Sequence, residues 1–159
     1  MIFVILGTQD KPFTRLLQAL EKEIKKGNIK EHVVVQAGST IFKSKYMEIY
    51  DYLDMKTFND YIKKCDYVIT HGGVGSILDS LKKNKKVLVV PRQAQYNEHE
   101  NDHQLQITEK FTDMGYILSC IDIKNLQKKL DQLQEFKPKK YISNNKKLIK
   151  KLENYIDNL

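Results

Sequence analysis

A glycine-rich turn is the clearest chemical signal in the sequence. The segment from Tyr67 to Asp79, YVITHGGVGSILD, runs from an apolar stretch through three glycines into a helical pattern. Glycines let backbone N–H groups approach a ligand, and the amino terminus of a helix adds partial positive charge. Asp79, one turn into the helix, can accept hydrogen bonds from ribose hydroxyls or can simply be a solvated acid. The combination suits a diphosphate, which we expect to be held by Gly72, Gly73, Gly75 and Ser76.

The positions of the other glycines place this turn at one edge of a sheet. Its spacing is neither Gly-x-Gly-x-x-Gly nor Gly-x-x-x-x-Gly-Lys-Ser/Thr, which disfavours a dinucleotide site and a P-loop ATPase. Gly7 and Gly38, like the glycines of the turn, fall just past the carboxyl end of an expected strand. Open parallel sheets bind their ligands at that edge. Gly27 and Gly115 instead follow helical patterns, where a C-cap with positive φ explains them.

A polar stretch, residues 91–104, follows another expected strand at the same edge. Its mixture of donors and acceptors suits the recognition of sugar hydroxyls. Capping of the next helix accounts for Asn101 or Asp102, but it leaves the rest of the stretch unexplained. His99 and His103 stand four residues apart, as on a helix face, yet only neighbouring acids are at hand as further ligands. We therefore expect no metal site here.

Apolar runs and helical patterns alternate along the chain and predict an α/β fold. Nearly continuous Val, Ile and Leu predict buried strands at 2–6, 32–37, 67–70 and 86–90. Apolar residues at helical spacing predict helices at 13–24 and 55–62, and the alternation continues with a helix at 105–114, a strand at 116–120 and a helix at 124–133. Such alternation implies right-handed crossovers and a mainly parallel sheet covered by helices on both faces.

The composition is that of a soluble globular domain whose charge is unevenly distributed. The chain has 159 residues, 41% of them hydrophobic, and a formal net charge of +7. Residues 124–159 contain 10 Lys and 4 acids, whereas residues 1–123 contain 17 basic and 16 acidic residues. The basicity therefore belongs to the tail, and no aromatic and basic platform indicates nucleic acid binding. Without an apolar run of about 18 residues or a signal peptide, and with Cys65 and Cys120 far apart, we expect a cytoplasmic protein with reduced thiols.

The carboxyl-terminal segment forms the second of two expected parts, 1–135 and 136–159. Pro138 lies among lysines ahead of a last helical pattern. We expect this Lys-rich linker and helix to pack either on the same domain or on a partner protein, with lysines beside acidic residues or anionic lipid headgroups. The apolar residues of the helix form one stripe: Leu148, Ile149, Leu152, Tyr155, Ile156 and Leu159.

Several segments together resemble a known family: ILGTQ, VVVQAGS, HGGVGSILD and EHENDHQLQITEKF. They are similar to the carboxyl-terminal, nucleotide-sugar-binding domain of family 28 glycosyltransferases, which is one Rossmann-like half of the GT-B architecture. The resemblance covers most of the chain. Within the family, the chain looks like the small soluble subunit of two-component UDP-sugar transferases that serve dolichol-linked glycan assembly or bacterial capsule and exopolysaccharide synthesis.

The resemblance also implies roles for particular residues. The Gly-Gly turn and its helix would hold the diphosphate and ribose, although the family usually has Glu at the position of Asp79. Asp102, His103 and Gln104 would contact the donor sugar, and Gly7 with Thr8 would face the phosphates. The whole expected binding set is Gly7, Thr8, Gly38, His71, Gly72, Gly73, Gly75, Ser76, Asp79, Arg92, Asp102, His103 and Gln104.

A complete GT-B enzyme has two such domains with the active site between them, and this sequence supplies one. The resemblance therefore implies a membrane-anchored second subunit that binds a lipid-linked saccharide acceptor and recruits this chain from the cytoplasm. The reaction would displace UDP from a UDP-sugar without a metal or other cofactor, with the catalytic base on the partner and His71 and His103 as weaker candidates. A non-catalytic enhancer of a partner glycosyltransferase and a UDP-sugar epimerase remain as alternatives, and the donor sugar and linkage stay open.

Overall fold

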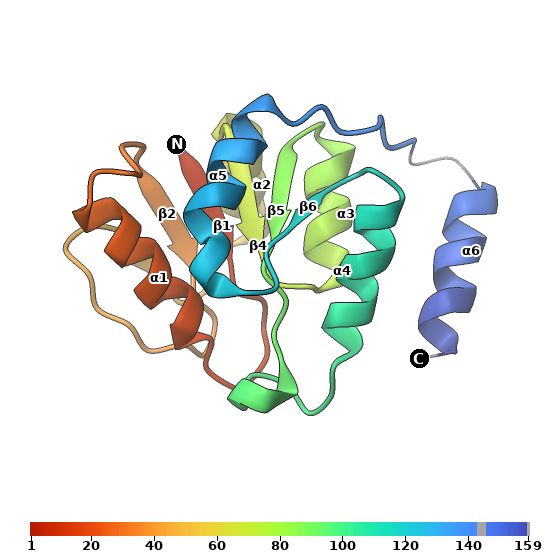
Figure 1. The fold of residues 1–159 in the computed structure, drawn as a ribbon, viewed down its shortest axis with the longest axis horizontal. Coiled ribbons are helices and arrows are strands. Elements are labelled where there is room, and N and C mark those ends of the chain that lie inside the picture. Colours follow the sequence, from red (N-terminus) through yellow and green to blue (C-terminus); the bar gives the residue numbers. More distant parts are fainter. Residues whose placement is uncertain (143–145, 159) are drawn as a thin grey trace.

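The chain folds into a parallel sheet, as the alternation of its elements predicts. A computed structural model describes residues 1–142 and 146–158 (Figure 1). The six strands lie in the order β3-β2-β1-β4-β5-β6, and every neighbouring pair is parallel. Their bounds are β1 Ile2–Ile5, β2 Val33–Gln36, β3 Glu48–Tyr50, β4 Tyr67–Thr70, β5 Lys86–Val89 and β6 Leu118–Ser119. This order confirms the predicted Rossmann-like fold, and it places a crevice between the loops that follow β1 and β4 at the carboxyl edge.

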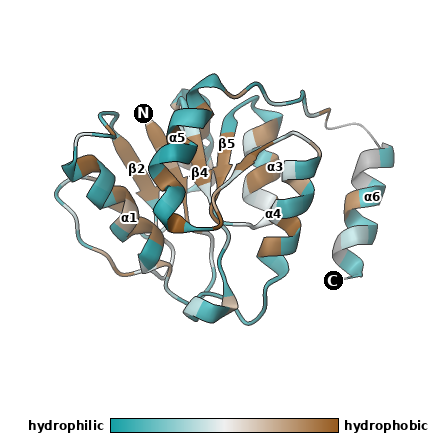
Figure 2. Ribbon diagram, in the orientation of Figure 1, coloured by the Kyte–Doolittle hydropathy of each residue, from teal (hydrophilic) through white to brown (hydrophobic). Residues whose placement is uncertain are grey.

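Helices cover both faces of the sheet because the central strands are apolar on both sides. On one face, Ile2 and Val4 share a core with α1 (Thr14–Lys25) and α5 (Leu126–Glu135). On the other face, Phe3 and Ile5 share a core with α2 (Met55–Lys64), α3 (Val74–Lys82) and α4 (His103–Asp113). Figure 1 shows α1 and α5 in front of the strands, and Figure 2 shows hydrophobic colour concentrated on the strands and on parts of the covering helices. None of the helices in the described ranges is long and apolar enough to cross a membrane.

The structure differs from the predicted elements mainly at their ends and at one edge of the sheet. The edge strand β3 was not predicted, because its Glu-Ile-Tyr sequence is half-buried or exposed and gives no apolar run. The strand predicted at 116–120 shortens to β6, and the helix predicted at 124–133 divides into a 3-10 turn, η2 (Ile123–Asn125), followed by α5. The positive φ predicted for Gly27 and Gly115 is confirmed at +77° and +78°.

A last helix, α6 (Lys146–Asp157), lies beside α4 at the margin of the molecule (Figure 1). Leu152 is buried within the core on the α4 face of the sheet. The Tyr155 hydroxyl donates to the carbonyl oxygen of Gln106 over 3.3 Å, and the Lys110 ammonium lies 5.3 Å from the Tyr155 ring centroid. The other side chains of the predicted stripe, Leu148, Ile149, Ile156 and Leu159, lie outside the part of the chain that is described.

Candidate functional site

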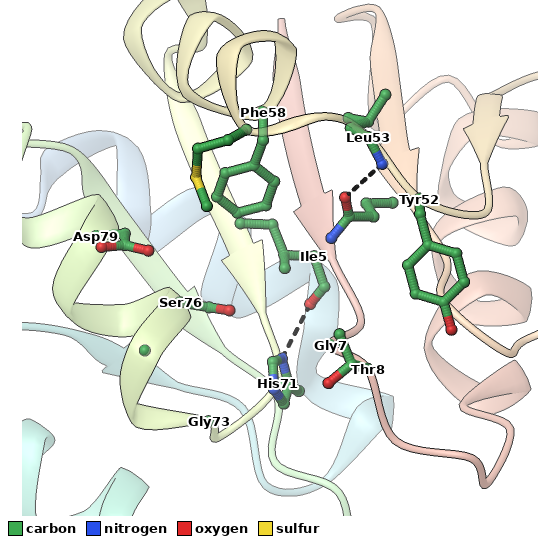
Figure 3. A pocket seen from close by; sticks show the side chains of 13 residues that line it. Ile5, Gly7, Thr8, Tyr52, Leu53, Phe58, His71, Gly73, Ser76 and Asp79 are labelled. Carbon is green, nitrogen blue, oxygen red and sulfur yellow. Dashed lines mark hydrogen bonds between the residues drawn. The ribbon is translucent and has the colours of Figure 1, made fainter.

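A cavity of about 430 Å³ opens at the carboxyl edge of the sheet, where β1, β2 and β4 end (Figure 3). Its walls come from the ends of β1 and β2, from the loops that follow β1, β3 and β4, and from the beginnings of α2 and α3. Residues predicted from the sequence make up one part of the lining: Gly7, Thr8, His71, Gly73, Gly75, Ser76 and Asp79. Residues that sequence reasoning missed make up the rest: Ile5, Gln36, Tyr52, Leu53, Met55 and Phe58.

The amino terminus of α3 forms the electropositive part of this cavity. Gly73 is the N-cap residue in an extended conformation, and the first turn of α3 contains no acidic residue that would offset the helix dipole. A Cβ atom added at Gly75 would meet no atom within 4 Å, so this side of the turn faces open space. Backbone N–H groups at such a terminus have no intrahelical partner and bind anions. The terminus therefore has the free backbone donors that an anion site needs, and anion binding there stays a prediction.

Two glycines are required because the loops after β1 and β4 pack on the same imidazole ring. A Cβ atom at Gly7 would lie 2.5 Å from His71 Nε2, and one at Gly73 would lie 2.3 Å from the same nitrogen. Gly7 also has a φ of +78°, which side-chain-bearing residues rarely adopt. Gly38 supports the first loop from behind, since a Cβ atom there would lie 2.3 Å from the Gly7 carbonyl oxygen. Gly38 belongs to the support of the cavity rather than to its lining.

His71 is a neutral hydrogen-bonding group at the base of the cavity. Its Nδ1 atom lies 3.3 Å from the carbonyl oxygen of Ile5 and 3.2 Å from the Thr70 hydroxyl. Donation from Nδ1–H to the Ile5 carbonyl assigns the tautomer and leaves Nε2 as an acceptor between Gly7 and Gly73. Burial, and then the positive charge of Arg92, lowers the pKa of His71 to about 4. At neutral pH His71 therefore adds no positive charge to the site.

Gln104 fastens the glycine turn to the loop after β5. Its Oε1 atom accepts hydrogen bonds from the backbone N–H groups of Gly72 and Arg92, each over 3.0 Å. A Cβ atom at Gly72 would lie 2.7 Å from the Cβ of Gln104, so the turn and α4 are in close contact. Gly72 and Gln104 are buried behind the cavity and do not line it. The structure thus gives both residues a positioning role.

Arg92 is a fully buried cation held by backbone carbonyl groups. Its guanidinium donates to the carbonyl oxygens of Leu6 and Lys11, each over 2.7 Å, and to that of Glu98 over 3.1 Å. It also lies 4.9 Å from the ring centroid of Phe13. Burial lowers the pKa of Arg92 to about 10, which leaves the side chain charged at neutral pH. The guanidinium joins the loop after β1 to the loop after β5, and it does not reach the cavity.

The remaining predicted residues lie at the start of α4, outside the cavity lining. Asp102 is exposed, and its Oδ1 atom accepts from the backbone N–H of Ala94 over 3.0 Å. His103 is half-buried, and its backbone N–H donates to Asn101 Oδ1 over 3.1 Å. Of the two capping residues considered, Asn101 therefore supplies the side-chain oxygen near the helix start. Within the described ranges, no group of three or more His, Cys, Asp and Glu side chains could hold a metal ion.

The far wall of the cavity is largely apolar, and it was not assigned to a site from the sequence, although Met55 and Phe58 lie on the predicted helix 55–62. Leu53 and Phe58 are half-buried, whereas Tyr52 is 59% exposed and Met55 is 75% exposed at the rim. Gln36 is the polar residue at the end of β2, and its Oε1 atom accepts from the Leu53 backbone N–H over 2.9 Å. A single polar residue ending the apolar VVVQ run is the signal that could have identified this wall.

Comparison with known proteins assigns the chain to a family. The protein-family model described as the glycosyltransferase family 28 C-terminal domain matches residues 1–159 of the chain. The chain belongs to this family. The resemblance noted in the sequence is thereby confirmed over the whole chain, including the glycine turn and the polar stretch.

The curated relatives that match the chain carry the name of a glycosyltransferase subunit. The UDP-N-acetylglucosamine transferase subunit ALG13 of Candida glabrata is 50% identical over 54 residues, 34% of this chain and 25% of that protein. The protein of the same name from Saccharomyces cerevisiae is 46% identical over 55 residues, 35% of this chain and 25% of that protein. The matches thus span about a quarter of the length of these fungal relatives.

Two solved structures support the fold of the family 28 domain. A solution structure of ALG13 superposes with a TM-score of 0.62 at 23% identity, covering 96% of this chain and 94% of that chain. MurG from Acinetobacter baumannii superposes with a TM-score of 0.58 at 12% identity, covering 98% of this chain and 44% of that chain. At these identities the superpositions establish the architecture alone. More than half of the MurG chain has no counterpart here.

Proposed function

We propose that this family 28 domain is the donor-binding subunit of a heteromeric glycosyltransferase that uses a UDP-sugar. The observation that carries the proposal is the cavity at the carboxyl edge, with the amino terminus of α3 at one end and an apolar wall at the other. An anion-binding terminus beside an apolar wall suits a ligand that joins a diphosphate to a planar base. The names of the fungal relatives, which are UDP-N-acetylglucosamine transferase subunits, support a nucleotide-sugar donor.

In this proposal the cavity divides the nucleotide among its walls. The diphosphate lies at the start of α3 and the loop after β1, against Gly73, Ser76, Gly7 and Thr8. The Asp79 side chain lines the cavity one turn further along α3, where its carboxylate accepts from ribose hydroxyls. The base lies against Leu53 and Phe58. Each part of the ligand thus meets a wall of matching polarity.

The proposed reaction is the displacement of UDP by an acceptor hydroxyl. The acceptor oxygen forms a bond to the anomeric carbon of the sugar, the bond from that carbon to the β-phosphate oxygen breaks, and the hydroxyl proton passes to a general base. The helix terminus stabilises the negative charge that develops on the departing diphosphate. His71 is a poor base because burial lowers its pKa to about 4, which favours a base supplied by the partner.

We further infer a membrane-anchored second subunit that binds a lipid-linked saccharide and recruits this chain from the cytoplasm, in surface polysaccharide synthesis. The word "subunit" in the names of the fungal relatives supports a divided enzyme. In this proposal the sugar that is transferred is a hexosyl or an N-acetylhexosaminyl group. An enhancer that does not bind the donor and a UDP-sugar epimerase remain the alternatives, and UDP binding by this chain separates the first of these from the proposal.

A charge reversal at the diphosphate position tests the proposal. In Ser76→Glu, the new carboxylate lies in the first turn of α3, where an acid stabilises a helix but repels a phosphate. We expect this variant to keep its thermal stability and to lose UDP binding at least about tenfold, measured by isothermal titration calorimetry. Gln18→Glu, an equal change of charge at an exposed position of α1, is the matched control and should bind UDP as the wild type does. Wild-type affinity in the Ser76 variant would contradict the diphosphate assignment.

A further inference from the structure

Gln36 presents an unused hydrogen-bond donor to the cavity. The residue is 8% exposed at the carboxyl end of β2, and its side chain contributes to the cavity wall. Its Oε1 atom accepts from the backbone N–H of Leu53 over 2.9 Å, the hydrogen bond drawn at Leu53 in Figure 3. This bond fixes which end of the amide is oxygen, because only the oxygen can accept. The NH₂ group therefore occupies the other end.

The NH₂ group of Gln36 has no acceptor among the described residues. Among the described residues, the fully buried side-chain N and O atoms that lack a hydrogen-bond partner are Arg92 Nε and Gln127 Oε1. Gln36 Nε2 is not one of them, so this atom is accessible from the open space of the cavity that Gln36 lines. A largely buried donor that is left unpaired carries a desolvation cost. Such a donor, held in one orientation by its own carbonyl, is suited to an acceptor on a bound ligand.

The surroundings of Gln36 indicate which part of a ligand it meets. Gln36 is the last residue of β2, it is bonded to Leu53, and Phe58 and Ile5 line the same cavity. The anion-binding groups come instead from α3 and from the loop after β1. A neutral amide donor beside apolar side chains suits an uncharged acceptor such as a ring carbonyl, whereas a phosphate oxygen is better served by the helix terminus.

We propose that Gln36 is a specificity-determining residue that reads the base of the donor, with its NH₂ group donating to a carbonyl oxygen of uracil. The inference rests on the proposed function, because it assigns one contact within the same cavity. Uracil presents two carbonyl oxygens, whereas adenine presents ring nitrogens and an amino group but no carbonyl. Gln36 therefore favours a uridine diphosphate over an adenosine diphosphate. The hydrogen bond between the Leu53 N–H and Gln36 Oε1 holds these two residues together at the apolar wall of the cavity.

Two substitutions at Gln36 separate this role from its support of Leu53. Gln36→Leu removes the donor and the acceptor together. Gln36→Glu keeps an oxygen for the Leu53 N–H but replaces the NH₂ group with a second oxygen, which repels a carbonyl. The measurement is the ratio of the dissociation constants for ADP and UDP, determined by calorimetry on the full chain. Gln18→Leu and Gln18→Glu, at an exposed position on α1, are the matched controls.

We expect the wild type and both Gln18 variants to prefer UDP, and we expect both Gln36 variants to lose that preference by about tenfold, the value of one hydrogen bond. Using a ratio removes any effect of the new charge on the diphosphate. An unchanged ratio in Gln36→Glu would show that Gln36 acts only through Leu53, and an unchanged ratio in Gln36→Leu would show that it contributes no contact; either result overturns the inference. A wild-type chain without preference for UDP would overturn the proposed function together with it.

Discussion

Buried charged and polar side chains behind the cavity set the electrostatic character of the site. Arg92 is charged and fully buried, yet each hydrogen-bonding partner that the structure gives its guanidinium is a backbone carbonyl. Glu98 is buried nearby and forms an ion pair with Arg15, with N–O distances of 2.8 and 3.0 Å. The positive charge of Arg92 therefore reaches His71, where it adds to the effect of burial and disfavours protonation. Donors of the backbone, rather than side-chain cations, are left to meet an anionic ligand.

The lowered pKa of His71 predicts a pH dependence of stability. In the unfolded chain the imidazole titrates near its ordinary value of 6.5, whereas in the folded chain it titrates at about 4. Between these values the unfolded state binds more protons, so stability falls as the pH decreases through this window. The expected loss between pH 7 and pH 4 is about 3 kcal/mol from this residue. Urea unfolding of the wild type and of His71→Gln at both pH values measures the difference.

The variant should show a weaker pH dependence, because its amide does not titrate. His32→Gln is the control, since His32 is exposed and lies far from the cavity, at the opposite end of β2. Equal pH dependence in the wild type and in His71→Gln would mean that the folded imidazole accepts a proton as readily as the unfolded one.

At the scale of the elements, α4 and the glycine turn act as one unit through Gln104. The resemblance to family 28 alone predicts that Gln104→Ala reduces sugar transfer and leaves binding of free UDP nearly unchanged. The structure leads us to expect a different result. Loss of Oε1 leaves the buried N–H groups of Gly72 and Arg92 without their acceptor. We therefore expect the free energy of unfolding to fall by about 2 kcal/mol and UDP affinity to fall about tenfold.

Calorimetry with UDP and urea unfolding of Gln104→Ala provide the test. Gln106→Ala is the matched control, because Gln106 lies two residues away on α4 and its side chain is exposed. Unchanged UDP affinity combined with lost transfer in the presence of a partner would support a direct contact between Gln104 and the donor sugar instead.

The sequence predicts the buried strands well because burial on both faces demands continuous apolar residues. Tyr67–Thr70 is predicted with its correct bounds, and β1, β2 and β5 are each predicted to within one residue at either end. The sequence does not predict β3, because the only strongly apolar residue of that strand is Ile49. Tyr52 and Leu53 are missed as cavity residues for the same reason, since they follow that strand. Met55 and Phe58 lie on the predicted helix 55–62, but their apolar side chains give no sign of a site. The polar stretch 91–104 contains both exposed and buried polar side chains, and the sequence does not distinguish Gln104, which is buried against the glycine turn, from Asp102, which is exposed.

At the scale of the whole molecule, the basic tail and the cavity belong to different regions. No described side chain of the linker or of α6 lines the cavity, whose walls come from residues 5–8, 36, 52–58 and 71–79. Tyr155 of α6 instead contacts Gln106 and Lys110 of α4, and Leu152 is buried in the core on that face of the sheet. Exposed lysines of α6, at positions 147, 150 and 151, face solvent. A partner bound to α6 would therefore not cover the cavity in which we propose that the nucleotide binds.

Deletion of residues 143–159 tests whether α6 serves a partner or completes the core. The sheet and its five other helices keep their own contacts in this truncation, and the described contacts that are lost centre on Leu152 and Tyr155. We expect a soluble chain whose free energy of unfolding is lower by about 2 kcal/mol, the value of burying one leucine. UDP affinity should be unchanged, because the cavity is intact, whereas co-purification with the second subunit should be lost. Leu152→Ala in the full chain is the companion variant, and it should show the stability loss while retaining the partner. An unfolded truncation product would mean that α6 is part of the core.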